Sequence, residues 1–246
     1  YGFPVDLTKE ILLERGFKGF DESAFDACME EQRKRAQAAW KGSGETKVEV
    51  EVGVPASTFT GYESMREESA VQALFSNGKR IDSALAGQNV EIVVATTPFY
   101  AESGGQVGDK GIIEGIAGHD LMVRVEVTRK TASNVYVHFG TVERGTVCMG
   151  DKVLLQVDGD SRHPTMKNHT ATHLLQAALR SVLGTHVKQS GSLVDSGTLQ
   201  FDFTHYEAVK HDDLRRIETM VNQWVYENHP VKMQIASMEE AQKRGA

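Results

Sequence analysis

The chain has 246 residues, a formal net charge of −7, 40% hydrophobic residues and 25% charged residues, which is typical of a globular protein. The acidic total argues against a general binder of nucleic acids, which would be strongly basic. No apolar run approaches the roughly 18 residues of a membrane span and no signal peptide is apparent, so we expect a cytoplasmic protein without a membrane partner. The two cysteines, Cys28 and Cys148, lack the spacing of metal ligands or of a disulfide framework.

The first part of the chain is predicted to be helical. One helix can be capped by Asp6 or Thr8, and a second begins near Asp21. The sequence Gly-Ser-Gly at residues 42–44 then interrupts the helical pattern, as a linker does. We therefore interpret residues 1–44 as a separate helical segment.

In residues 45–160 apolar and polar residues alternate, so the hydrophobic pattern has a period of two. Short alternating runs between Gly, Asn and Asp residues are typical of an antiparallel β-barrel. The turns are expected to contain Gly87, Gly118, Gly145 and Gly150. The strands are expected around residues 48–54, 90–94, 123–127, 135–139 and 153–157.

Residues 161–246 alternate between helices and strands, which indicates an α+β domain. The first helix is expected to have Pro164 in its first turn and to end at Gly184. The elements expected after it are a strand at 198–204, a helix at 206–227, a strand at 231–235 and a short helix capped by Ser237. The buried side of the 206–227 helix is expected to contain Leu214, Ile217, Met220, Val221, Trp224 and Val225.

The most informative residues are His169 and His173, which lie four positions apart in the first of these helices. Residues at this spacing share one helix face, where two imidazoles can bind one zinc ion. The apolar residues of the helix fall on the opposite side, so a core position does not explain the pair. The alternative is two solvated histidines on a polar face.

The same region is locally basic, because residues 161–190 contain no Asp or Glu. Its cationic side chains are Arg162, Lys167, Arg180 and Lys188. A basic face on an acidic protein can bind one phosphate-rich partner at one place. The alternative is chance clustering on a solvated face.

Two polar loops are candidates for a binding site. In residues 99–109, the adjacent Gly104 and Gly105 permit close approach of a ligand, and Gln106 offers both a donor and an acceptor. The alternative is an ordinary hairpin turn of the barrel. Residues 186–192 are predicted to fold back toward the histidine helix, or else to form a plain loop before the next strand. No phosphate-binding loop or dinucleotide motif is present.

Several stretches together resemble the editing region of alanyl-tRNA synthetases and of their free-standing editing relatives. The matching stretches are TPFYAESGGQVGD at 97–109, NHTATHL at 168–174, QSGSLV at 189–194, FDFT at 201–204 and YGFPVDLT at 1–8. The last stretch favours a full synthetase, and we interpret the chain as an internal fragment of one. The resemblance implies a translation-factor-like barrel at 45–160, followed at 161–246 by an α+β editing core shared with threonyl-tRNA synthetases.

The resemblance also implies a function, which is hydrolysis of serine or glycine wrongly attached to tRNA(Ala), within an enzyme that ligates alanine to tRNA(Ala) using ATP. It implies that His169 and His173 are zinc ligands and that Gln189 and Ser190 act in catalysis and serine recognition. It further implies a substrate-binding loop formed by Gly104, Gly105 and Gln106. From charge alone, we predict contacts of Lys167, Arg180 and Lys188 with the tRNA acceptor end.

The chain departs from the family pattern in one respect. The family completes its zinc site with a downstream Cys-x-x-x-His segment, and this sequence ends at Ala246 before such a segment. We therefore expect half a zinc site, with weak zinc binding and impaired hydrolysis. Two alternatives stay open: a tRNA-binding module without catalytic activity, and a structural zinc domain.

Overall fold

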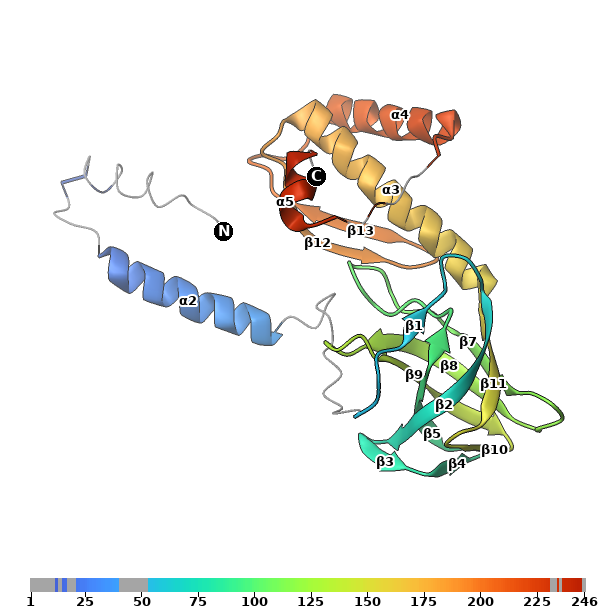
Figure 1. The fold of residues 1–246 in the computed structure, drawn as a ribbon. Helices are drawn as coiled ribbons and strands as arrows, with labels where there is room; N and C mark the ends of the chain where they lie inside the picture. The colour runs from blue at the N-terminus through green and yellow to red at the C-terminus, as the bar shows by residue number, and fades with distance from the viewer. Residues whose placement is uncertain are drawn as a thin grey trace. The chain divides into compact units, whose positions relative to one another are not determined.

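A computed structural model describes residues 12, 15–16, 21–39, 53–230, 234 and 236–244. The chain divides into two compact units, residues 1–44 and 45–246. The first unit contains helix α2, Glu22–Ala39 (Figure 1). The helix begins as predicted, because the carboxylate of Asp21 accepts hydrogen bonds from the backbone N–H of Ala24 and the hydroxyl of Ser23. The earlier helix and the strand expected at 48–54 lie largely outside the described residues.

The second unit begins with a closed barrel of six antiparallel strands (Figure 1). The strands follow the order β11-β7-β8-β9-β5-β2, and β11 closes the barrel by pairing with β2. Their bounds are Arg66–Ser76 (β2), Asn89–Val94 (β5), Gly111–Gly115 (β7), Met122–Lys130 (β8), Tyr136–Arg144 (β9) and Lys152–Val157 (β11).

Short strands extend this barrel. Strand β3, Lys79–Ile81, pairs with β2, and β4, Ser83–Leu85, pairs with β10, Thr146–Cys148. Strand β1, Thr58–Phe59, runs parallel to β6, Thr96–Thr97.

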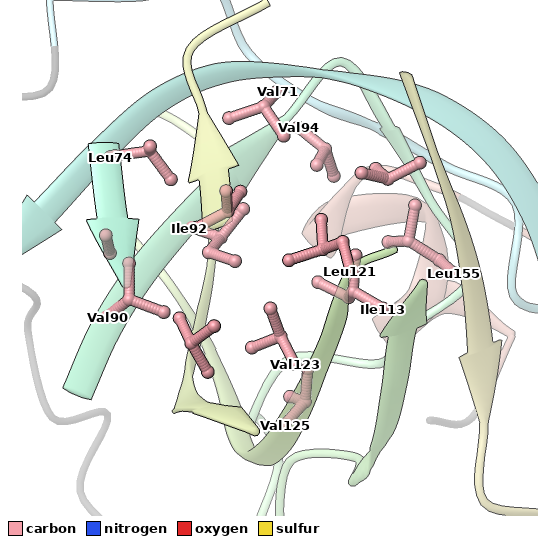
Figure 2. Packing of buried hydrophobic residues seen from close by; sticks show 14 of the residues in the cluster. Val71, Leu74, Val90, Ile92, Val94, Ile113, Leu121, Val123, Val125 and Leu155 are labelled. Atoms are coloured by element: carbon pink, nitrogen blue, oxygen red, sulfur yellow. The ribbon is translucent and has the colours of Figure 1, made fainter. Parts of the chain in front are cut away.

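The barrel encloses one continuous hydrophobic core, because alternate residues of each strand point inward (Figure 2). Its largest fully buried side chains include Phe99, Leu74, Ile92, Ile113 and Leu155. The strands expected at 90–94, 123–127, 135–139 and 153–157 are confirmed. The four predicted turn glycines all have positive φ, between 74° at Gly145 and 89° at Gly150. Strands β2 and β7 were not predicted.

One polar side chain, His138, lies in the barrel interior with 1% of its surface exposed. Its Nδ1 donates to the carbonyl of Ile92 at 3.0 Å, and its Nε2 accepts from the hydroxyl of Thr97 at 2.8 Å. Burial lowers the pKa of His138 from 6.5 to about 4. The ring is therefore neutral in the folded protein at neutral pH.

The rest of the second unit is an α+β layer. Strands β12, Gln189–Val194, and β13, Leu199–Phe203, form an antiparallel hairpin. Helix α3, Gly159–Leu183, lies along this hairpin, and α4, His211–Glu227, packs on α3 (Figure 1). The small core between them is centred on Ala178, Leu179, Val187 and Ile217. Among the described residues, no helix is long and apolar enough to cross a membrane.

Two predictions about the start of α3 and its surroundings were wrong. The helix begins one turn earlier than expected, with Asp158 as its N-cap, so that Pro164 lies inside the helix. The segment predicted as a loop at 186–192 is largely strand β12, because Gln189 to Val194 pair with β13. Its polar composition gives no alternating hydrophobic signal.

The prediction for α4 was partly wrong. Ile217 is buried, and Met220, Val221 and Trp224 pack against the core as expected. Leu214 and Val225 are instead about half exposed, at 46% and 55%, because α4 contacts the described part of the layer along a narrow stripe.

Helix α4 also begins at His211 rather than near residue 206. The strand expected at 231–235 lies almost wholly outside the described residues. The last helix, α5, spans Met238–Lys243 and begins as predicted, with the hydroxyl of Ser237 accepting from the backbone N–H of Glu240.

Candidate functional site

A buried arginine attaches the start of α3 to the barrel. Only 4% of the surface of Arg162 is exposed, and its guanidinium forms a salt bridge with Asp109. It also donates to the carbonyl oxygens of Gly61 and Pro98, each at 2.8 Å. Asp109 in turn accepts from the backbone N–H of Tyr100 at 2.7 Å. This network fixes the start of α3 on the segments that flank residues 103–107, because Pro98 and Tyr100 precede those residues and Asp109 follows them.

Arg162 was expected on a basic surface, and this prediction was wrong. The carboxylate of Asp109, which neutralises Arg162, is close in space but lies 53 residues earlier in the chain. A charge can be buried at modest cost only when it is paired and hydrogen-bonded, and the network supplies both conditions.

The glycine loop, residues 103–107, adds a short stretch of pairing to the edge of β12. Val107 donates to the carbonyl of Val194 at 3.0 Å, and Val194 donates to the carbonyl of Gly105 at 2.8 Å. Gly105 has φ of +81°, and a Cβ placed on it would lie 2.8 Å from the Cβ of Ser192. A glycine is therefore needed here both for the backbone conformation and for the close approach to β12.

The loop places Gln106 against the histidine helix. Gln106 is 4% exposed, and its Oε1 lies 2.7 Å from Nδ1 of His169, 63 residues later in the chain. An amide oxygen only accepts, so Nδ1 of His169 donates this hydrogen bond. Nε2 is then the unprotonated nitrogen of the neutral ring. Burial and, secondarily, the neighbouring His173 lower the pKa of His169, which favours this neutral form.

His173 lies beside His169, as the spacing predicted. The ring centroids are 5.2 Å apart with an interplanar angle of 18°, and His173 is the more exposed of the two. The hydrogen bond from Nδ1 of His169 to a carbonyl oxygen is typical of metal-ligating histidines, whose other nitrogen binds the metal. The pair therefore fits two positions of a zinc site. Within the described residues, no cluster of three or more potential ligands is found.

A pocket of about 240 Å³ opens beside this hydrogen bond. Its walls come from the barrel on one side and from α3 on the other. The lining residues are Tyr62, Tyr100, Gln106, Arg162, Met166, His169 and Thr170. Tyr62 and Met166 were not singled out in the sequence, because no local motif marks them.

Gln189 and Ser190 lie at the other end of β12. Gln189 pairs with Phe203, whereas Val194 is the residue that bridges to Gln106. Five residues of strand correspond to roughly 16 Å. Both side chains are exposed, and the hydrogen bonds described for this region do not join them to His169 or Gln106. Their catalytic role stays a prediction.

The three cationic residues predicted to contact tRNA are exposed. Lys167 and Arg180 lie on α3, and Lys188 immediately precedes β12. Lys188 is held by its backbone N–H, which donates to the hydroxyl of Thr204 at 3.2 Å. These positions are accessible to a polyanionic partner.

Comparison with known proteins identifies the family of this chain. The chain belongs to the family described as tRNA synthetases class II (A), which matches residues 1–161. Over its full length the chain is 45% identical to the alanine–tRNA ligase of Chloroflexus aurantiacus. It is 44% identical to the alanine–tRNA ligases of Methylobacillus flagellatus and Thermus thermophilus. The chain spans 27% to 28% of the length of these relatives, and its resemblance to a part of alanyl-tRNA synthetases is confirmed.

Proposed function

We propose that the pocket beside His169 is an editing site that hydrolyses the ester bond of Ser-tRNA(Ala) or Gly-tRNA(Ala). The complete enzyme would ligate alanine to tRNA(Ala) using ATP, and residues 161–246 would form its editing core. The observation that carries the proposal is the 2.7 Å hydrogen bond between Gln106 and His169. It joins the glycine loop to the histidine helix, two of the stretches on which the family resemblance rests.

Editing answers a problem of specificity. A pocket shaped for alanine cannot strongly reject serine, which adds only a hydroxyl group. A second site with polar groups for that hydroxyl selects serine, because an alanine ester would leave those groups without partners. The family resemblance assigns these polar groups to Gln189 and Ser190, a role that stays a prediction because both lie at the far end of β12 from Gln106. In this proposal the glycine loop lets the backbone approach the aminoacyl ester.

The residues of this chain orient the reacting groups. Gln106 holds the imidazole of His169 in one tautomer and one orientation, with Nε2 unprotonated. His169 and His173 would hold zinc together with ligands from elsewhere in the protein. When bound, the metal would supply a Lewis acid for the ester carbonyl or for the attacking water.

The test is deacylation of Ser-tRNA(Ala) by the protein, run beside a longer polypeptide that extends past residue 246. We expect His169→Ala to reduce the rate by about 100-fold or more, the range typical for loss of a positioned catalytic group. His163→Ala is the matched control, because His163 is an exposed histidine of the same helix. Ala-tRNA(Ala) should be hydrolysed much more slowly than Ser-tRNA(Ala).

Other outcomes would favour the alternatives. Tight tRNA binding without deacylation in either polypeptide would indicate a non-catalytic tRNA-binding module. A large fall in melting temperature of the His169→Ala and His173→Ala variants, without a selective loss of deacylation, would indicate a structural zinc domain.

The proposed tRNA contacts make a separate prediction. If Lys188 contacts a phosphate, Lys188→Ala should weaken tRNA binding and reduce the slope of log K against log salt by about one. Lys79→Ala is the matched control, because Lys79 is an exposed lysine on β3. Filter binding across a salt series gives the slope, and equal slopes for both variants would rule out the contact.

A further inference from the structure

We propose that the pocket beside His169 holds the terminal nucleobase of the ester substrate, between the side chains of Tyr62 and Met166. This inference rests on the proposed editing function and names the part of the substrate that the pocket binds. Every tRNA carries its amino acid on a terminal adenosine, so the base lies one ribose away from the ester. A base between Tyr62 and Met166 would place the ester toward His169 and Gln106.

The backbone that carries Tyr62 is fixed, although 64% of the side chain is exposed. The carbonyl oxygen of the preceding residue, Gly61, accepts a hydrogen bond from the guanidinium of Arg162 at 2.8 Å. A Cβ on Gly61 would overlap the carbonyl oxygen of Pro98, so the turn is pressed closely against the neighbouring chain. Tyr62 therefore presents an aromatic ring from a defined position at the entrance of the pocket.

The ring of Tyr62 is supported by a cluster of aromatic side chains. It packs edge-on against Phe59, with ring centroids 5.0 Å apart and an interplanar angle of 83°. Phe59 stacks in parallel on Tyr136, with ring centroids 5.6 Å apart, and makes an edge-type contact with Tyr100, with ring centroids 6.1 Å apart. Such a cluster limits the movement of Tyr62 and leaves one side of the ring available for stacking.

Met166 provides an apolar surface on the α3 side of the pocket. It is 49% exposed and lies three residues before His169, on the adjacent turn of the helix. Flexible thioethers and aromatic rings are suitable partners for a flat heteroaromatic ring.

The electrostatics of the pocket favour an uncharged ring over a phosphate. Of the residues that line it, Arg162 carries the fixed positive charge, and its guanidinium is engaged by Asp109, Gly61 and Pro98. The pocket volume of about 240 Å³ is below the range of roughly 300–1,000 Å³ for complete drug-sized ligands, so it suits one ring system of a larger substrate.

The experiment compares two non-hydrolysable probes by calorimetry. The first is the seryl amide of 3′-amino-3′-deoxyadenosine, and the second is the same amide on a ribose without a base. We expect the first probe to bind more tightly. Tyr62→Ala should weaken binding of the first probe by about tenfold, the order of one lost base stack, and leave the second unchanged. Met166→Ala should have a smaller effect in the same direction.

Two further variants act as controls. Tyr62→Phe keeps the ring and should bind the first probe as the unchanged protein does. Tyr226→Ala removes a tyrosine that is 89% exposed on α4, outside the pocket, and should have no effect. Tyr226→Ala should not change the melting temperature appreciably, and Tyr62→Ala should lower it only slightly, because the exposed ring of Tyr62 contacts Phe59 alone among the ring contacts described for it.

The inference is overturned if both probes bind equally to the unchanged protein, or if Tyr62→Ala weakens both probes alike. Deacylation of Ser-tRNA(Ala) separates this failure from that of the proposed function. Hydrolysis without base-dependent binding would refute the base pocket alone. Base-dependent binding without hydrolysis, even by a polypeptide extending past residue 246, would refute the editing function and leave the base pocket in place.

Discussion

The barrel and the α+β layer of the second unit differ in how they are stabilised. Among the described residues, the barrel buries sixteen hydrophobic residues in one cluster, whereas the core between α3, α4 and the β12–β13 hairpin has four buried residues. Several apolar side chains of the layer, such as Leu193 and Val225, are about half exposed in the described structure. Within the part of the chain that the structure describes, the barrel therefore has the larger core, and the layer that carries the histidines depends more on its attachment to the barrel.

The comparison shows where that attachment lies. The Arg162–Asp109 network holds the start of α3, and the glycine loop pairs with the edge of β12. The contact between Gln106 and His169 lies between these two attachments. The proposed site in this position would combine a rigid scaffold with a region of lower local stability, which is a common arrangement for binding sites.

The largest expected effect is that of removing the buried arginine. Arg162→Met would leave the carboxylate of Asp109 buried without its partner, so we expect the free energy of unfolding to fall by about 3–5 kcal/mol. Arg144→Met is the matched control, because Arg144 pairs with Asp120 on the surface and such pairs contribute about 0–1 kcal/mol. Chemical denaturation measures both, and equal losses would show that the network does not hold the two regions together.

The second expected effect concerns the barrel alone. The neutral His138 has a pKa of about 4 when folded and near 6.5 when unfolded, so the unfolded state binds the proton more tightly. Stability should therefore fall as the pH drops below about 6.5 and level off below about 4, with a loss of about 3 kcal/mol.

The pH dependence of the stability of His138→Gln tests whether protonation of His138 causes this loss. The variant should lose about 3 kcal/mol less than the unchanged protein between pH 7 and pH 4, measured by urea denaturation. Parallel profiles for the two proteins would assign the acid sensitivity to other groups.

The third expected effect concerns the contact between the glycine loop and β12. Gly105→Ala should destabilise the protein by about 2 kcal/mol, because it adds a clash with Ser192 to the strain of a positive φ. Gly104→Ala is the matched control, because Gly104 also has positive φ but its Cβ would point into open space. We expect about 1 kcal/mol for the control.

Hydrogen exchange shows where in the structure Gly105→Ala acts. In Gly105→Ala, the amides of Val107 and Val194 should exchange faster, since both take part in the pairing between the loop and β12. Unchanged protection of these two amides would contradict the importance of the close approach.

Strict hydrophobic alternation made most of the barrel predictable, as in β5 and β8. It failed for β2, whose first residues, Arg66 to Ser69, carry charges and a hydroxyl at both alternating positions. Strand β7 was missed because it is short and has a glycine at each end. A search for alternating polar and apolar residues therefore detects strands that have one polar and one apolar face. It overlooks strands whose two faces are similar in polarity.

The site was predictable in part. The helical spacing of His169 and His173 follows from the geometry of the helix, and their proximity is confirmed. The contact with Gln106 depends on long-range pairing, so only the family resemblance connected the two stretches. Arg162 looked like a surface residue because nothing near it in the sequence indicates Asp109 as its partner.

The central claim is that the glycine loop and the histidine helix form one site through Gln106 and His169. The most direct measurement is a double-mutant cycle on the deacylation rate of Ser-tRNA(Ala) by the polypeptide that extends past residue 246, with Gln106→Ala, His169→Ala and the double variant. If Gln106 acts by orienting His169, each single variant should lose activity and the double variant should be no slower than His169→Ala. Losses that add in free energy, or a Gln106→Ala variant with unchanged activity, would contradict the account.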